Sequence, residues 1–129
     1  MILVDALIVG AGPIGGYLAK KLVDNGKSVL MLEEHAQIGR PFQCAGLVNP
    51  GSMAKVGLEE VAQTRIWGAR IHGPEGTLVE IGSPDRTRTW SVCRKLFDEA
   101  VVNMAVSSGA GLMLNSKPVE TQIFDDRVG

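Results

Sequence analysis

The sequence has few cysteines, no surplus of charge of either sign and no long apolar run. Its two cysteines, Cys44 and Cys93, are too few for a disulfide framework and are typical of a reducing compartment. Lys and Arg number 13 against 14 Asp and Glu, whereas nucleic-acid-binding proteins usually carry a basic surplus. No stretch reaches the roughly 18 unbroken apolar residues of a membrane span. Asp5 interrupts the apolar N-terminus and no basic residue precedes it, so we expect no secretory signal. These absences predict a cytoplasmic protein with at most peripheral membrane contact and no nucleic-acid partner.

The composition is that of a folded domain that is rich in glycine. The chain has 129 residues, 45% of them apolar and 21% charged, which is close to the average for globular proteins. This length fits one domain or part of one. The 16 glycines indicate tight turns or places where the backbone approaches another group closely.

The first third of the chain predicts a strand, a helix and a second strand. Residues 3–9 form an apolar run that ends at a glycine, which predicts a strand buried on both faces. Ile14, Leu18 and Leu22 recur every four residues, with Ala19 and Val23 beside them, and predict the apolar face of an amphipathic helix. Residues 28–32 predict a second buried strand. The three elements make a βαβ unit, for which we expect a right-handed crossover.

The remaining residues alternate between loops and short elements. A long loop over residues 34–52 is followed by a short helix over 53–62 and by two strands around a turn over 67–81. A helix with Ser91 as its N-cap then covers residues 91–107, a third parallel strand covers 112–114, and one arm of a hairpin covers 119–124. The fold class is therefore α/β, a Rossmann-like βαβ unit with a parallel sheet and an inserted β-hairpin. Because the last arm has almost no chain after it, we expect an incomplete domain, the N-terminal part of a longer protein.

The turn between the first strand and the helix has the pattern G-x-G-x-x-G. Gly10 permits the tight turn, Gly12 lets the main chain touch a pyrophosphate, and Gly15 lets the helix pack closely on the strand. The N-terminus of the helix offers amide groups and a positive dipole end to phosphates. This context favours a dinucleotide site over a glycine turn that binds nothing.

An acidic residue follows at the spacing of a ribose-binding carboxylate. Glu33 ends the second strand 23 positions after Gly10, near the usual spacing of about 20. Glu34 and His35 supply no arginine for a 2′-phosphate, which disfavours NADP. The alternative is that Glu33 is a solvated glutamate at a strand end.

These motifs resemble those of known flavoproteins. Gly10-x-Gly12-Pro13-x-Gly15 followed by Glu33 resembles the glutathione-reductase-type FAD-binding oxidoreductases, and the resemblance favours FAD over NAD. The segment from Arg40 to Gly46 is similar to the Pro-x-x-Cys-x-Gly segment of the geranylgeranyl reductase family. The segment from Arg94 to Asp98 is similar to the Arg-x-x-Phe-Asp of that family. Its FAD-dependent members saturate the isoprenoid double bonds of membrane lipids.

The resemblance implies FAD as the cofactor, a geranylgeranyl lipid as the substrate and an electron donor that it does not identify. It also implies a set of cofactor contacts. They are Gly10, Gly12, Gly15, Glu33, Arg40, Cys44, Ala45, Gly46, Arg94 and Pro118.

Beside the resemblance, Arg40, Arg94 and Cys44 also have physical interpretations, whereas Pro118 rests on the resemblance alone. Arg40 can neutralise a pyrophosphate charge. Arg94, at the start of a helix, either meets a phosphate or ribose or is an ordinary surface arginine. Pro118 lies where the resembled family passes main chain over the adenine. Cys44 has three interpretations: a backbone contact to the flavin, a catalytic thiol that donates a proton, or a small buried hydrophobic residue.

The chain as a whole is expected to be the N-terminal part of an FAD-binding domain, residues 1–129. Within it, the hairpin of residues 66–90 is assigned to the side of a substrate domain, because Trp67, Ile71, Leu78 and Ile81 need burial. His35 and His72 lack the spacing of metal ligands, so no metal site is expected.

Three other hypotheses stay open from the sequence. The first is an FAD-dependent aromatic hydroxylase of the same fold. The second is a non-catalytic Rossmann module that senses NAD. The third is a fragment that folds poorly and has no activity alone.

Overall fold

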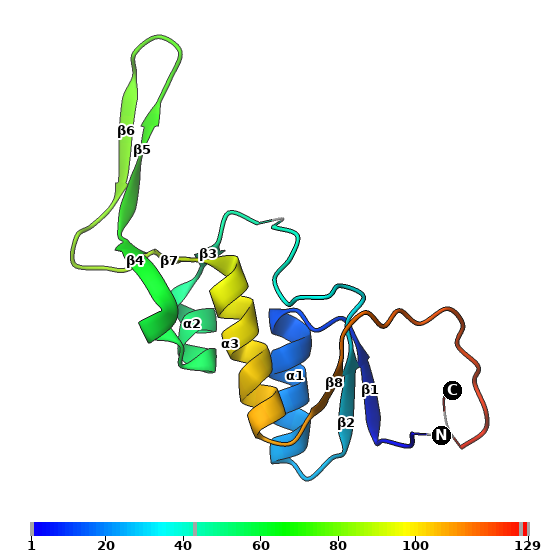
Figure 1. The fold of residues 1–129 in the computed structure, drawn as a ribbon. Coiled ribbons are helices and arrows are strands. Elements are labelled where there is room, and N and C mark those ends of the chain that lie inside the picture. The colour runs from blue at the N-terminus through cyan, green and yellow to red at the C-terminus, as the bar shows by residue number, and fades with distance from the viewer. Residues whose placement is uncertain (1, 43, 127, 129) are drawn as a thin grey trace. The chain divides into compact units, whose positions relative to one another are not determined.

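The structure is a computed structural model that describes residues 2–42, 44–126 and 128 (Figure 1). It consists of two compact units, residues 1–40 with 98–129 and residues 41–97. The elements run in the order β1 (Ala6–Val9), α1 (Pro13–Asp24), β2 (Val29–Leu32), β3 (Leu47–Val48), α2 (Pro50–Val56), a 3₁₀ turn (Glu59–Val61), β4 (Ala62–Ile66), β5 (Gly68–His72), β6 (Leu78–Gly82), β7 (Thr89–Val92), α3 (Arg94–Ser107) and β8 (Gly111–Met113). No described helix is both long enough and apolar enough to cross a membrane.

The first unit is built on a parallel sheet with the strand order β1-β2-β8. Helix α1 connects β1 to β2, and α3 ends just before β8. This confirms the predicted α/β class, the βαβ unit and the third parallel strand. Because all three strands point the same way, their carboxyl ends meet at one edge, where ligands of such sheets bind.

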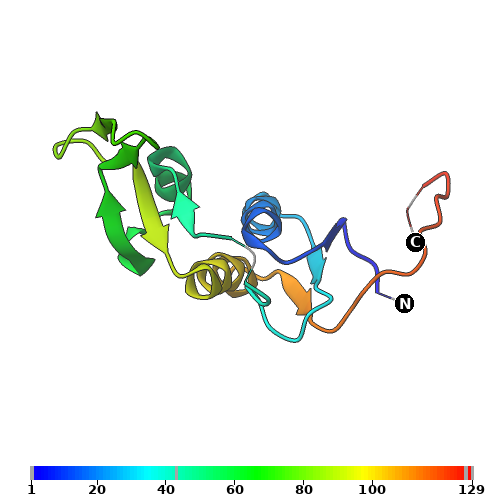
Figure 2. The same cartoon turned by 90° about the horizontal axis from the view of Figure 1, so that it is seen from above.

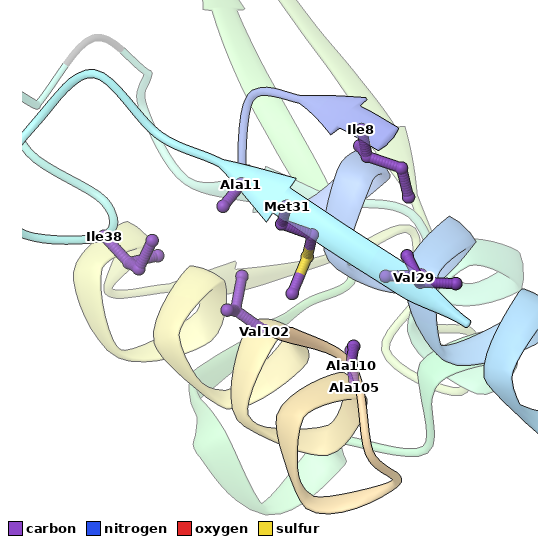
Figure 3. Close-up of a cluster of buried hydrophobic side chains, with 9 residues drawn as sticks. Ile8, Ala11, Val29, Met31, Ile38, Val102, Ala105 and Ala110 are labelled. Atoms are coloured by element: carbon purple, nitrogen blue, oxygen red, sulfur yellow. The ribbon is translucent and has the colours of Figure 1, made fainter. Parts of the chain in front are cut away.

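The core of the first unit lies on one face of this sheet. Helices α1 and α3 lie on that same side in the view from above (Figure 2), and Val102 and Ala105 of α3 lie on the side of the sheet to which Met31 of β2 points (Figure 3). The cluster consists of Ile8, Ala11, Ala19, Val29, Met31, Ile38, Val102, Ala105 and Ala110. The prediction that the first strand is buried on both faces is wrong, since Leu7 and Val9 are exposed.

Helix α1 packs through only part of the predicted apolar face, since Ala19, Leu22 and Val23 contact the core while Ile14 and Leu18 are exposed. Ile14 is 82% exposed and Leu18 is 47% exposed, whereas Gly16 and Ala19 are buried. A Cβ atom on Gly16 would lie 3.0 Å from Cγ2 of Val102. The helix therefore approaches its neighbours most closely where its side chains are smallest, at Gly16 and Ala19.

The second unit contains the antiparallel sheet β3-β7-β4 and the two-stranded ribbon β5-β6. The ribbon confirms the predicted hairpin. The predicted long loop ends earlier than expected because β3 pairs with β7. The short helix predicted over residues 53–62 lies earlier in the chain, as α2, where the side chain of Asn49 caps the helix by accepting from the Ser52 amide at 2.8 Å and Gly57 ends it.

The predicted start of the second long helix is wrong. Ser91 lies in β7, where it pairs with Leu47 and Thr64, and α3 begins at Arg94. Pairing with strands on both sides outweighs the local tendency of a serine to cap a helix. At the other end of the chain, the predicted strand over residues 119–124 is reduced to one bridge, Ile123 with Val128, among the residues described there. Arg127, which follows this predicted hairpin arm, lies outside the described residues.

Candidate cofactor-binding site

The turn that follows β1 holds a conformation that only glycine adopts easily. Gly10 has a φ of +96°, and its amide donates to the carbonyl oxygen of Leu32 at 2.7 Å. A Cβ atom on Gly15 would overlap the carbonyl oxygen of Gly10 and lie 3.3 Å from Cγ2 of Ile8. The first turn of α1 thus rests directly on the end of β1.

The N-terminus of α1 presents main-chain amides next to Gly12, which carries no side chain of its own to cover them. Gly12 is the N-cap residue, and the first intrahelical bond runs from the Gly16 amide to the Gly12 carbonyl oxygen at 2.8 Å. The amides of Ile14 and Gly15 precede that bond and lie at the positive end of the helix dipole. A Cβ atom on Gly12 would meet nothing within 4 Å among the described residues. Open space and polarised amides are what a pyrophosphate requires.

Glu33 lies beside this turn at the carboxyl end of β2. Its Oε2 accepts from the Ala11 amide at 2.9 Å. Its Oε1 accepts from the His35 amide at 3.0 Å and lies 2.6 Å from Nδ1 of the His35 ring. The side chain is 13% exposed, so this carboxylate is held in place rather than freely solvated.

These contacts lower the pKa of Glu33. Partial burial alone would raise it, but the hydrogen bonds from the amide and ring of His35 and from the Ala11 amide together outweigh burial. The carboxylate is therefore ionised at neutral pH, as an acceptor of ribose hydroxyls must be.

The protein is expected to lose part of its stability as this carboxylate is protonated. Because the pKa of folded Glu33 lies below its ordinary value of 4.5, its contribution is complete above pH 4.5 and is lost as the pH falls through the folded pKa. Urea unfolding of wild type and Glu33→Gln, at neutral pH and at several values below 4.5, measures this. The other carboxylates titrate in both proteins, so their effect cancels in the comparison. On acidification, wild type should therefore lose more of its free energy of unfolding than Glu33→Gln does. Equal losses in the two proteins would contradict the prediction.

The segment after β8 is hydrogen-bonded to the residues that follow β2, at the carboxyl edge of the sheet. The Ser116 amide donates to the Glu33 carbonyl oxygen at 2.8 Å, and the Asn115 amide donates to that of His35 at 3.2 Å. Nζ of Lys117 lies 2.8 Å from Oε2 of Glu34, and this pair lowers the pKa of Glu34 and raises that of Lys117. Pro118, the next residue, is exposed. Pro118 therefore directly follows two residues, Ser116 and Lys117, that contact the segment of Glu33 and Glu34.

Sequence reasoning missed three neighbours of Glu33 and Glu34. From the sequence, His35 has neither the chemistry of a 2′-phosphate ligand nor the spacing of a metal ligand, and nothing predicts the contacts of Ser116 and Lys117. The only signal for His35 was its position two residues after Glu33. Nothing in the sequence could locate Ser116 and Lys117, because they come from the far end of the chain.

The predicted residues of the second unit form a separate group. Gly46 has a φ of +76°, and its carbonyl oxygen accepts from the Val92 amide at 2.8 Å. A Cβ atom there would overlap the Val92 carbonyl oxygen and lie 3.7 Å from Cγ of Arg94. Two motifs almost 50 residues apart thus meet at the start of α3.

The other predicted residues are exposed. Cys44 and Ala45 precede Gly46, and Arg40 ends the first part of the first unit. Exposure of Cys44 contradicts its interpretation as a small buried hydrophobic residue and leaves a cofactor contact or a thiol acid. Gln43, considered with this segment, lies outside the described residues.

Comparison with known proteins gives consistent matches over this chain. The FAD binding domain family matches residues 3–101. The digeranylgeranylglycerophospholipid reductase of Methanosarcina acetivorans is 33% identical over 96% of this chain and 31% of its own length. That of Methanocella arvoryzae is 32% identical over 88% of this chain and 30% of its own. The chain therefore spans about a third of the length of these curated relatives.

Solved structures share the fold. A geranylgeranyl bacteriochlorophyll reductase-like protein from Thermoplasma acidophilum superposes with a TM-score of 0.87 over 97% of this chain and 33% of its own, at 24% identity. A flavin-dependent brominase superposes with a TM-score of 0.77 over 97% of this chain and 32% of its own, at 21% identity.

Proposed function

The chain belongs to the FAD binding domain family, and we propose that it is the cofactor-binding part of a flavin-dependent reductase that saturates carbon–carbon double bonds of geranylgeranyl chains in membrane lipids. The observation that carries the proposal is the Glu33 carboxylate fixed beside the open amides of the glycine turn. The names of the curated archaeal relatives support the lipid substrate. Such a substrate implies transient contact with a membrane surface.

The residues of the first unit fit the adenosine and pyrophosphate parts of FAD. The amides of Gly12, Ile14 and Gly15 would hold the pyrophosphate, and Glu33 would accept from the ribose. Pro118 would pass beside the adenine, because the preceding residues are fastened to the Glu33 segment. Arg40 would neutralise phosphate charge.

The residues of the second unit would serve the rest of the cofactor. Arg94 and the segment from Cys44 to Gly46 meet at the start of α3. Gly46 permits this because it has no side chain to collide with Val92. Amides of this segment and the Arg94 guanidinium would contact the flavin side of FAD.

Saturation of an isolated alkene requires a hydride at one carbon and a proton at the other. FAD, when bound and reduced, supplies the hydride. Cys44 is exposed and carries a thiol proton on Sγ, so we assign it as the proton donor. The electron donor that reduces the cofactor is a separate partner.

The β5-β6 ribbon would belong to the substrate side of the protein. Its register places Ile71 opposite Val79, and Ala69 opposite Ile81, on one face, while Arg70 pairs with Glu80 at 2.5 Å on the other. The apolar face is exposed in the described structure. A two-stranded ribbon is marginally stable alone in water, so a further part of the protein should cover this face.

The proposal is tested with protein reconstituted with FAD and reduced anaerobically by dithionite. On addition of geranylgeranyl lipid, we expect reoxidation of the flavin and a saturated product by mass spectrometry. A Cys44→Ser variant should retain FAD but lose at least about tenfold in turnover, since a hydroxyl is a weaker acid than a thiol. Cys93→Ser is the matched control, and equal turnover by Cys44→Ser and wild type would remove Cys44 from the mechanism.

A second arm separates the reductase from the aromatic hydroxylase. Wild-type protein is given phenols in air with reduced FAD. Hydroxylated product from phenols, with no change in the lipid under anaerobic conditions, would overturn the reductase proposal.

A further inference from the structure

The two oxygens of the Glu33 carboxylate have different partners. An ionised carboxylate only accepts hydrogen bonds and offers about four lone-pair positions, two on each oxygen. On Oε1, both positions are taken by His35, one by its main-chain amide and one by its ring. On Oε2, the Ala11 amide takes one position. The position that remains on Oε2 is on the oxygen nearer the glycine turn.

The ring contact also fixes the state of the histidine. Because the carboxylate can only accept, Nδ1 of His35 must carry the proton in the 2.6 Å contact. The ring therefore acts as a donor whether it is neutral or charged. His35 is the third residue after β2, and its carbonyl oxygen accepts a hydrogen bond from the Asn115 amide.

We propose that His35 is a positioning residue for the adenosine ribose of the cofactor. By holding Oε1 with two donors, it fixes the rotamer of Glu33 so that Oε2 meets a ribose hydroxyl beside the glycine turn. The inference rests on the proposed binding of FAD and adds a residue that no motif of the sequence assigns to the site. Without the ring, the carboxylate can rotate about its last torsion, and its orientation must be fixed at the moment of binding.

The charges around this pair are few. Glu34 precedes His35 on the same segment, and Lys117, from the segment after β8, forms an ion pair with Glu34. The positive charge of Lys117 is thus committed to Glu34, and the hydrogen-bond donors described on Glu33 are His35 and Ala11. Removal of the His35 ring should therefore raise the pKa of Glu33 without a substitute donor from these neighbours.

The experiment compares wild type, His35→Ala and His35→Asn by FAD titration, with His72→Ala as the control. Ala keeps the main-chain amide and removes the ring, while Asn places a side-chain donor near the position of Nδ1. We expect about tenfold weaker FAD binding for His35→Ala, within about threefold of wild type for His35→Asn, and no change for His72→Ala. A purely structural role would not give rescue by Asn.

A second readout does not depend on the cofactor. Carboxyl NMR of Glu33 during a pH titration should show its midpoint at a higher pH in His35→Ala than in wild type, and restored toward wild type in His35→Asn. As the pH is lowered, the His35→Ala protein should therefore begin to lose FAD affinity at a higher pH than wild type does.

The outcomes separate the two proposals. Wild-type protein that does not bind FAD would remove both the proposed function and this inference. Wild-type protein that binds FAD while His35→Ala binds equally well would overturn only the inference, as would an unchanged Glu33 midpoint.

Discussion

Replacement of Gly12 by alanine is expected to weaken FAD binding at least about 100-fold while the fold is kept. The position has an ordinary φ of −78°, and a Cβ atom there would meet no described atom within 4 Å. The methyl group would instead occupy the space in front of the first amides of α1, where the pyrophosphate must approach. Titration with FAD, followed by flavin fluorescence, measures the loss.

The same variant must be shown to be folded. Alanine is a poorer N-cap residue than glycine, so we expect the free energy of unfolding to fall by no more than about 1 kcal/mol, as measured by thermal unfolding. Gly12→Ala protein that binds FAD as tightly as wild type would show that the pyrophosphate does not lie on these amides, and the assignment of the site would fail.

Replacement of Gly15 by alanine is expected to act on stability instead. In a helix, this change normally stabilises by about 1 kcal/mol. Here the new Cβ atom would overlap the carbonyl oxygen of Gly10, a backbone atom that no side-chain rotation can move. We expect the free energy of unfolding to fall by at least about 3 kcal/mol, because α1 must shift away from the end of β1. Urea unfolding followed by circular dichroism measures the change.

Gly12→Ala serves as the control for Gly15→Ala, because both add one methyl group to the same turn. A Gly15→Ala protein as stable as wild type would mean that α1 does not pack against Gly10 as described. The pair therefore separates the role of the turn in binding from its role in packing.

The site shows how far local sequence carries a prediction. Gly10, Gly12, Gly15 and Glu33 could be assigned because a strand, a turn and a helix that are adjacent in the chain fix their relative positions. His35 could not, because its ring contact depends on a rotamer rather than on spacing. The resemblance assigns Gly46 and Arg94, but their contact with each other could not be predicted, because the pairing of their segments is long-range.

The errors have a common physical origin. Ser91 was predicted as a helix cap, but β7 pairs with strands on both sides, and those hydrogen bonds outweigh one cap. The predicted apolar face of α1 includes Ile14 and Leu18, which are exposed, whereas the buried contact runs through Gly16 and Ala19 with Leu22 and Val23 beside them. Periodicity identifies a helix, but the shape of the neighbouring elements selects its buried face.

The sequence by itself determined the α/β class, the parallel βαβ unit, the glycine turn and the acid that follows it. These depend on contacts between residues near in the chain, whose spacing fixes their geometry. Tertiary structure alone decided that one face of the sheet is covered and that residues 115–117 are fastened to the Glu33 segment. It also decided that Gly46 meets Arg94. Those features arise from packing between distant segments, where close contact depends on the summed fit of many side chains.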